Sequence, residues 1–421
     1  MSFIELPHSS VQLNDVTVPG WAVGGSENLV RTNLAYEGER ITVSGRMPVE
    51  MGGAMVLPAF IDMHTHLDKG HIWHRAPNSQ GSFADALETV ARDRIVNWSA
   101  SDVRARMEFS LRCAYAYGTR AIRTHIDSIP PQDEITWPVF AEVREDWCQK
   151  IDLQGSCLVG IDSIDFDGPF QRTATLVAKY DGLLGLVAYP VADLRGRLRK
   201  FFSIADDHGL AVDFHADETL DRNTECLRAI AEVSLESGFD HSITVGHCCS
   251  LTTQDISRAL DTLDIVAQAG IHVVSLPMCN LYLQDRRSGQ TPRMRGITLI
   301  HEMQSRGINV SFASDNTRDP FFAYGDLDMM EVMREATRLG HLDHSDVDWS
   351  HAFLTNPAQA CGFSIPSLSS GFPADFIIFK ARNWNELLSR PQSDRVVIRA
   401  GKQITRALPD YCELDYLMEN A

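Results

Sequence analysis

The feature that most constrains the fold is an alternation, in the middle of the chain, between short runs of β-forming residues and longer amphipathic segments. The amphipathic segments, such as residues 101–116 and 224–237, show helical periodicity. The β-forming runs are residues 56–62, 120–124, 152–158, 182–188, 211–214, 243–246, 271–276 and 308–313. Eight parallel strands that alternate with helices are the plan of a (β/α)8 barrel, although seven or nine runs could also be counted. We therefore expect an α/β fold with a TIM barrel at its centre.

Both ends of the chain show a different pattern, in which short β-forming runs are separated by turn residues. The runs are residues 11–13, 21–23 and 40–43 near the start, and 375–379, 395–399 and 403–404 near the end. We expect the two ends to meet in one small β-sandwich domain, residues 1–55 together with 365–421, while residues 56–364 form the catalytic barrel. Separate β units at the two ends are the alternative. The length agrees, because one barrel of about 250 residues absorbs most of a chain of 421.

The charge balance narrows the class of partner. The chain has 38 Lys and Arg residues against 56 Asp and Glu, a formal net charge of −18. It lacks the excess of cations that nucleic acid polymers or anionic membranes require, so we expect neither partner and favour a small neutral or cationic ligand. No apolar run reaches the roughly 18–20 residues of a membrane span, and the first residues do not resemble a signal peptide. The nine cysteines, without a repeating spacing, are typical of reduced thiols, so we expect a cytoplasmic protein.

Two histidines stand at the end of the first expected barrel strand. His64 and His66 are two residues apart, so on an extended strand both imidazoles project from the same face. Two neutral imidazoles side by side supply half of a tetrahedral metal site; the alternative is a pair of polar residues that merely end a strand. Their position favours the metal, because the carboxyl ends of barrel strands surround the mouth, where active sites lie.

Other expected strands end in the same kinds of residue. His215 closes the fifth strand, His247 closes the sixth, and Asp315 follows the eighth. A single divalent ion would find three nitrogen ligands and one oxygen ligand in His64, His66, His215 and Asp315. This set leaves room for a bound water. Such an ion lowers the pKa of bound water from about 15.7 toward about 7, which provides hydroxide at neutral pH. Iron, zinc and manganese all accept this ligand set.

Proton transfer also has candidate residues. Glu218 follows His215 by three residues and is expected on the loop above the mouth, where it could serve as a general acid and base. A solvated loop carboxylate is the alternative for Glu218. His247 could hold the attacking water or stabilise the negative charge that develops on it.

These motifs resemble those of the amidohydrolase superfamily, and among its branches they are most similar to bacterial cytosine deaminase and its relatives. The motifs are His-Thr-His-Leu-Asp-Lys at 64–69, His-Ala-Asp-Glu at 215–218, the single His247, and Ser-Asp-Asn-Thr-Arg-Asp-Pro at 314–320. The likeness extends over nearly the whole chain, through residues 123–127, 150–154, 280–284, 295–298 and 371–377. It implies a mononuclear iron or zinc site whose ligands are His64, His66, His215 and Asp315. The expected fourth strand agrees, because residues 183–190 contain no Lys, Asp or Glu that could bridge two metals.

The resemblance also implies roles for further residues. Glu218 would protonate the ring nitrogen beside the attacked carbon, His247 would orient the hydroxide, and Asp315 would relay the proton of the water to departing ammonia. Gln154 would hydrogen-bond the amide edge of the ring, since an amide side chain offers both a donor and an acceptor. The pocket wall would be lined by Phe83, Asn316 and Phe321. Family members often have Asp where this chain has Asn316, and Trp where it has Phe321.

We therefore expect a metal-dependent hydrolase that deaminates a small aminated heterocycle. The resemblance favours cytosine or a cytosine-like base, such as 5-methylcytosine or isocytosine, and a role in pyrimidine metabolism. Amine removal from, or opening of, a triazine or another cyclic amidine or amide is the first alternative, and a metal-binding barrel without catalysis is the second. The small zinc deaminase fold does not apply, because the chain has neither His-x-Glu nor Pro-Cys-x-x-Cys. Relatives commonly self-associate, so a homo-oligomer is an open expectation.

Overall fold

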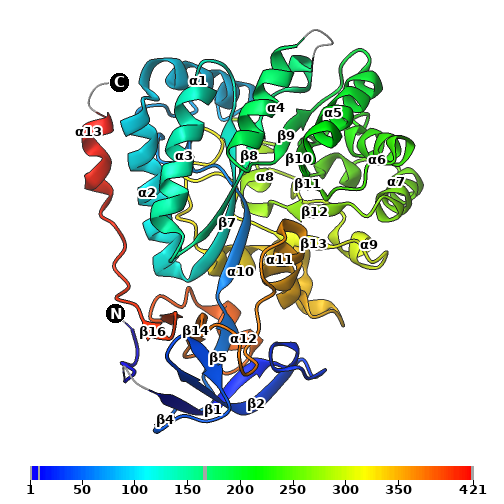
Figure 1. Cartoon of the computed structure of the whole chain (residues 1–421). Coiled ribbons are helices and arrows are strands. Elements are labelled where there is room, and N and C mark those ends of the chain that lie inside the picture. The colour runs from blue at the N-terminus through cyan, green and yellow to red at the C-terminus, as the bar shows by residue number, and fades with distance from the viewer. Residues whose placement is uncertain (1, 8–9, 165–167, 419–421) are drawn as a thin grey trace.

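The computed structural model describes residues 2–7, 10–164 and 168–418 of the chain. A barrel of strands wrapped by helices forms the larger part, and a smaller β unit lies below it (Figure 1). Among the described residues, none of the helices has the length and apolar character needed to span a bilayer.

Eight parallel strands form the barrel in the order of the sequence. They are β6 (Phe60–Thr65), β7 (Thr119–Asp127), β8 (Asp152–Leu158), β9 (Leu184–Ala188), β10 (Val212–Ala216), β11 (Ile243–His247), β12 (His272–Ser275) and β13 (Val310–Phe312). β6 to β8 pair as one ladder and β9 to β13 as another. Parallel bridges from Ser156 to Leu183 and from Gly160 to Val187 join β8 to β9. A further bridge, from Thr65 to Asp315, joins the end of β6 to the segment after β13, so the two ladders meet at both edges.

One expected barrel strand proves to be two strands. The apolar run at 56–62 spans the end of β5 (Met55–Pro58) and the start of β6. β5 pairs with β14 (Phe376–Phe379) outside the barrel, and the chain passes into the barrel at Ala59. Both strands are buried along their whole length, so hydrophobicity gives no sign of the break between them.

Most helices cover the barrel because they present an apolar stripe to the strands. The helices are α1 (Phe83–Asn97), α2 (Ala100–Tyr117), α3 (Asp133–Trp147), α4 (Pro169–Lys179), α5 (Leu194–His208), α6 (Cys226–Ser237), α7 (Ile256–Gln268), α8 (Pro277–Leu283), α9 (Ile300–Gln304), α10 (Met329–Gly340), α11 (Thr355–Cys361), α12 (Trp384–Ser389) and α13 (Asp415–Met418). Of these, α12 lies at the smaller β unit and α13 packs beside α2 (Figure 1). Local sequence sets the bounds of α2. Ser99 accepts a hydrogen bond from the Asp102 N–H at its start, and Gly118, with a φ of 98°, ends it.

The smaller unit is one sheet of eight strands drawn from both ends of the chain. Besides β5 and β14, its strands are β1 (Val11–Pro19), β2 (Leu29–Glu37), β3 (Arg40–Thr42), β4 (Met47–Glu50), β15 (Val396–Arg399) and β16 (Lys402–Gln403). Their order is β16-β15-β14-β5-β1-β2-β3, with β4 paired to β1. The antiparallel pair of β5 and β14 brings the segment before the barrel beside the segment after it. The domain boundaries at 55/56 and 364/365 stay a prediction.

Candidate active site with a metal centre

Three histidines and one aspartate converge at the carboxyl ends of the barrel strands. His64 lies in β6, His66 directly follows it, His215 lies in β10, and Asp315 follows β13. The Nε2 atom of His215 is 3.1 Å from that of His64 and 3.3 Å from that of His66. The Oδ1 atom of Asp315 is 3.5 Å from His64 Nε2 and 3.2 Å from His66 Nε2. The four residues expected as ligands therefore direct their metal-ligating atoms toward one point.

The spacing of these atoms fits one divalent ion. Ligand atoms about 2.0–2.2 Å from a tetrahedral ion lie about 3.3–3.6 Å from one another, close to the observed 3.1 to 3.5 Å. Within the described residues neither carboxylate oxygen of Asp315 accepts from an N–H or O–H group, although both are buried. Burial without such a donor is costly for an ionised carboxylate, and a cation nearby offsets that cost. The residues present thus fit a bound metal ion.

Burial prepares these side chains for a cation. It lowers the pKa of His64, His66 and His215 well below the usual value for histidine, so the imidazoles are neutral at pH 7 and keep a free lone pair. Burial also raises the pKa of Asp315 to about 8. A divalent ion would oppose that rise, because a positive charge favours the ionised carboxylate.

An amide, an imidazole and a carboxyl stand beside the four expected ligands. The Nδ2 atom of Asn280, in α8, donates to His247 Nδ1 at 3.0 Å and to Glu218 Oε1 at 3.2 Å. Because His247 Nδ1 accepts, the ring proton is on Nε2, which is buried and has no partner in the described parts of the chain. A ring nitrogen of His247 lies within 4.8 Å of ring nitrogens of His64 and His215. His247 can therefore donate a hydrogen bond toward the expected ligands.

Glu218 is placed to act as an acid. Burial raises the pKa of its carboxyl well above the usual value, and the nearby Asp315 carboxylate raises it further. The carboxyl consequently keeps its proton to a higher pH than an ordinary glutamate does, and can deliver it to a bound molecule. The alternative of a solvated loop carboxylate does not describe this side chain, which is only 15% exposed.

The expected ligands open into a cavity of about 390 Å³. Five of the six residues expected as ligands or acid-base groups line it: His66, His215, Glu218, His247 and Asp315. Phe83, at the start of α1, and Phe321 meet edge to face in its wall, with ring centroids 5.6 Å apart. Asn316 also lines the cavity, and its amide donates to Asp319 at 2.6 Å. The residues expected at the pocket wall therefore share a cavity with the expected ligands.

Comparison with known proteins identifies the family. The sequence model of the Amidohydrolase family matches residues 151–405. The chain belongs to the amidohydrolase family. A pterin deaminase from Rhizobium rhizogenes (strain K84 / ATCC BAA-868) is 50% identical over 416 residues, 97% of this chain and 95% of that protein. N-isopropylammelide isopropyl amidohydrolase from Pseudomonas sp. (strain ADP) is 21% identical over 375 residues, 85% of this chain and 88% of that protein.

A solved structure of the same architecture confirms the fold. It is a 5-methylcytosine deaminase from Klebsiella pneumoniae in complex with 5-fluorocytosine, and it matches this amidohydrolase with a TM-score of 0.80 at 21% identity. The match covers 95% of this chain and 98% of that one. The expectation of an α/β barrel of the metal-dependent hydrolase type is confirmed.

The structure corrects one expected substrate contact. Gln154 is the third residue of β8, near the end of the strand that is opposite to the mouth. Its amide nitrogen donates to the Cys361 carbonyl at 2.8 Å, and its carbonyl oxygen accepts from Arg123 Nε at 3.2 Å. These three residues line a separate cavity. The prediction is wrong because β8 continues to Leu158, and the residues of this segment that reach the active-site cavity are Leu158, Val159 and Gly160.

Some polar residues of the active-site cavity have no role in the sequence prediction. Lys69 Nζ lies 2.8 Å from Asp127 Oδ1, and a guanidinium nitrogen of Arg94 lies 2.8 Å from Asp127 Oδ2. Lys69, Asp127 and Asn280 belong to segments that carry the family likeness, so a signal was present in the sequence. Arg94 lies on α1, where no motif marks it.

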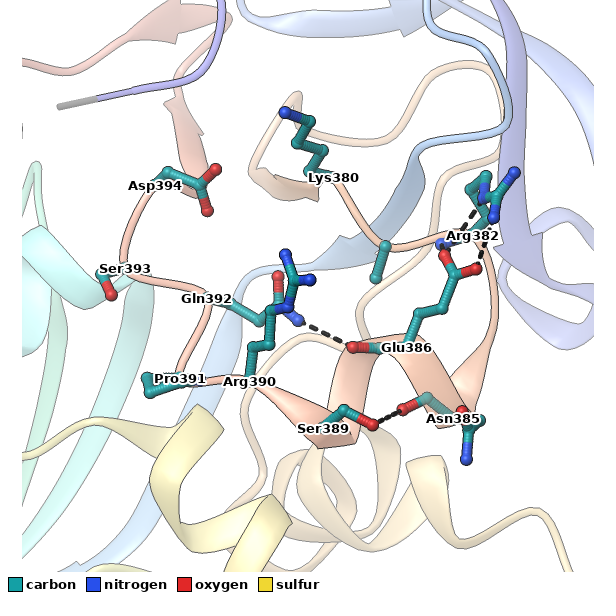
Figure 2. A pocket seen from close by; sticks show the side chains of 11 residues that line it. Lys380, Arg382, Asn385, Glu386, Ser389, Arg390, Pro391, Gln392, Ser393 and Asp394 are labelled. Atoms are coloured by element: carbon teal, nitrogen blue, oxygen red, sulfur yellow. Dashed lines mark hydrogen bonds and ion pairs between the residues drawn. The ribbon is translucent and has the colours of Figure 1, made fainter.

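A second cavity, of about 600 Å³, lies beside α12 (Figure 2). Some of its polar side chains bind one another or the backbone. Arg382 pairs with Glu386 at 2.6 Å, and the Gln392 amide donates to the Glu386 carbonyl at 3.0 Å. None of the expected ligand or acid-base residues lines this cavity. The candidate functional site is therefore the cavity at the barrel mouth.

Proposed function

We propose that this amidohydrolase removes the exocyclic amine of a pterin-type 2-amino-4-oxo heterocycle by hydrolysis and releases ammonia. The observation that carries the proposal is the largely buried Glu218 carboxyl, which accepts a hydrogen bond from Asn280 beside His247 and the expected ligands. Hydrolysis at an amidine carbon requires a proton on the ring nitrogen, and such a carboxyl supplies it. The pterin deaminase that is 50% identical to this chain supports a pterin over cytosine as the substrate.

Each residue has a defined task in this proposal. His64, His66, His215 and Asp315 would hold Fe²⁺ or Zn²⁺, which makes water a nucleophile at neutral pH. Glu218 gives its carboxyl proton to the ring nitrogen beside the attacked carbon. His247 donates from Nε2 to the attacking oxygen and stabilises the charge that develops there. Asp315 Oδ2 takes one proton from the water and passes it to the amine, so that ammonia can leave, and the second water proton returns to Glu218 as the new carbonyl forms.

The cavity suits a flat ring system with two fused rings. The pyrimidine half of a pterin carries the amine and oxo groups of isocytosine, so the expectation of a cytosine-like base applies to that half. The second ring needs apolar surface, which Leu158 and Val187 supply in the same cavity. Phe83 and Phe321 offer aromatic faces and edges to either ring.

A substrate panel tests the proposal. Purified protein loaded with one metal at a time is given pterin, isocytosine, cytosine, 5-methylcytosine, an aminated triazine and a cyclic amide, and ammonia is measured. We expect ammonia from pterin with the highest kcat/KM of the panel, on the order of 10⁴ M⁻¹s⁻¹ or more. Ammonia from none of the compounds, or turnover of the cyclic amide alone, would contradict the proposal.

A further inference from the structure

We infer that Lys69 is a specificity-determining residue that donates a hydrogen bond to the ring oxo group of the substrate. It follows that this amidohydrolase selects heterocycles that carry an oxo group next to the aminated amidine. The inference rests on the proposed function and deepens it, since it names the substrate group that the cavity recognises besides the amine.

Lys69 lies in the cavity and not on the surface. It follows His66 by three residues, its side chain is 5% exposed, and it lines the same cavity as Glu218. Its ammonium group is 5.6 Å from the centroid of the Phe321 ring, which belongs to the cavity wall. A flat substrate in contact with Phe321 therefore comes within reach of this ammonium.

The ammonium of Lys69 has unused donors. A lysine side chain carries three N–H groups. Among the described residues, Asp127 Oδ1 is the acceptor within hydrogen-bond distance of Nζ, at 2.8 Å. Two donors are therefore left for the contents of the cavity. A buried charged donor without an acceptor is costly, so a substrate oxygen at this place is strongly favoured.

Asp127 fixes where Lys69 points. One oxygen of its carboxylate binds Lys69, the other binds Arg94 at 2.8 Å, and its backbone N–H donates to Asp68 Oδ2 at 2.8 Å. Because Lys69 and Arg94 engage both carboxylate oxygens of Asp127, this part of the cavity wall presents N–H donors to the substrate. An oxo group, which only accepts hydrogen bonds, matches such a wall, whereas an amine does not.

The topology places Lys69 across the mouth from the acid. Lys69 follows the first barrel strand, β6, and Asp127 is the last residue of the second, β7, while Glu218 follows the fifth, β10. In a barrel of eight strands the first and fifth face each other across the mouth. A ring that offers one nitrogen to Glu218 consequently turns its opposite edge toward Lys69. In a 2-amino-4-oxo ring, the two nitrogens N1 and N3 flank the aminated carbon, and the oxo carbon lies across the ring from N1.

The test compares two substrates in two proteins. Pterin and 2-aminopteridine, which lacks the oxo group, are assayed with the wild type and with Lys69→Met, which keeps the apolar stem and removes the donors. We expect kcat/KM for pterin to fall about 10- to 150-fold, the effect of a hydrogen bond to a charged group. The value for 2-aminopteridine, or its inhibition constant where it is not turned over, is expected to change less than threefold.

The outcomes separate this inference from the proposed function. Equal losses for both compounds would overturn the inference, because a merely structural lysine affects them alike. A wild type that releases no ammonia from any aminated heterocycle would instead overturn the proposed function. Lys380→Met, at an exposed position of the cavity in Figure 2, is the matched control and should leave both values unchanged. If Lys69→Met does not fold, Lys69→Gln is used, because it retains a weaker neutral donor. This variant must also lower kcat/KM for pterin more than for 2-aminopteridine, by a smaller factor.

Discussion

At the scale of single residues, Asn280 links the two groups that handle protons. Its amide nitrogen donates to His247 and to Glu218, so it sets the tautomer of the imidazole and holds the carboxyl in place. The result is an imidazole whose proton is on Nε2 and a largely buried acid beside it. An acid and a hydrogen-bond donor of this kind are what attack on an amidine carbon requires.

Replacing Glu218 by Gln should abolish turnover while the metal is retained. The amide keeps the size and the hydrogen bond to Asn280 but has no proton to transfer, so we expect kcat to fall about 10²- to 10⁴-fold. Steady-state kinetics and metal analysis on one preparation check this. Glu225→Gln is the control, because Glu225 pairs with Arg258 at the surface. This variant should leave kcat and the metal content unchanged. More than a tenth of the activity left in Glu218→Gln would contradict the role.

The sequence predicts well what depends on local spacing. The period of two along a strand places His64 and His66 on one face, and the structure brings His215 and Asp315 to them. The position of a strand end is harder to read, which is why Gln154 is misplaced by a few residues. Lys69 and Asp127 are 58 residues apart, and no local pattern reveals that they pair.

At the scale of elements, a buried ion pair ties the terminal sheet to the barrel helices. Arg395, next to β15, is 1% exposed and donates from both terminal nitrogens to Asp328, at 2.6 and 2.7 Å. Asp328 also caps α10 by accepting from the Met330 N–H. The contact joins segments 67 residues apart, so periodicity could predict β15 and α10 but not that they are linked.

Removing one partner of this pair should destabilise the fold. Arg395→Met leaves Asp328 without its cation, and we expect a loss of about 3–5 kcal/mol in the free energy of unfolding. The measurement is the shift of the urea unfolding midpoint. Arg382→Met is the matched control, since that arginine also binds a carboxylate at 2.6 Å but on the exposed surface, and it should not shift the midpoint. An unchanged midpoint for Arg395→Met would show that the pair does not stabilise the fold.

At the scale of the whole molecule, the fold brings distant parts of the chain to one cavity. Site residues come from the ends of β6, β10 and β11 and from the segment after β13, from His64 to Asp315. The barrel could be predicted because its alternation repeats along the sequence, whereas the crossing from β5 to β6 could not, because the apolar run at 55–61 continues through it without a break. Self-association, a cytoplasmic location and the absence of polymer partners stay predictions.

Removal of the metal should lower the stability of the whole chain. An ion that binds the folded state adds about 2.7 kcal/mol when its free concentration is about 100 times Kd. We expect a strong chelator to lower the Tm, and one equivalent of Fe²⁺ or Zn²⁺ per chain to restore it. His241→Gln is the control, because this residue belongs to an exposed cluster with Asp206 and Asp240 and should leave the stoichiometry at one. Two tightly bound ions per chain would contradict a mononuclear site.

The most direct test of the account is the fate of the oxygen. The metal-loaded enzyme is given pterin in water enriched in ¹⁸O, and product and ammonia are quantified by mass spectrometry. Hydrolytic deamination predicts one ¹⁸O atom in the intact ring system in place of the amine, with one ammonia released for each product. A ring-opened product that has gained a whole water, or a product without the label, would contradict the central claim.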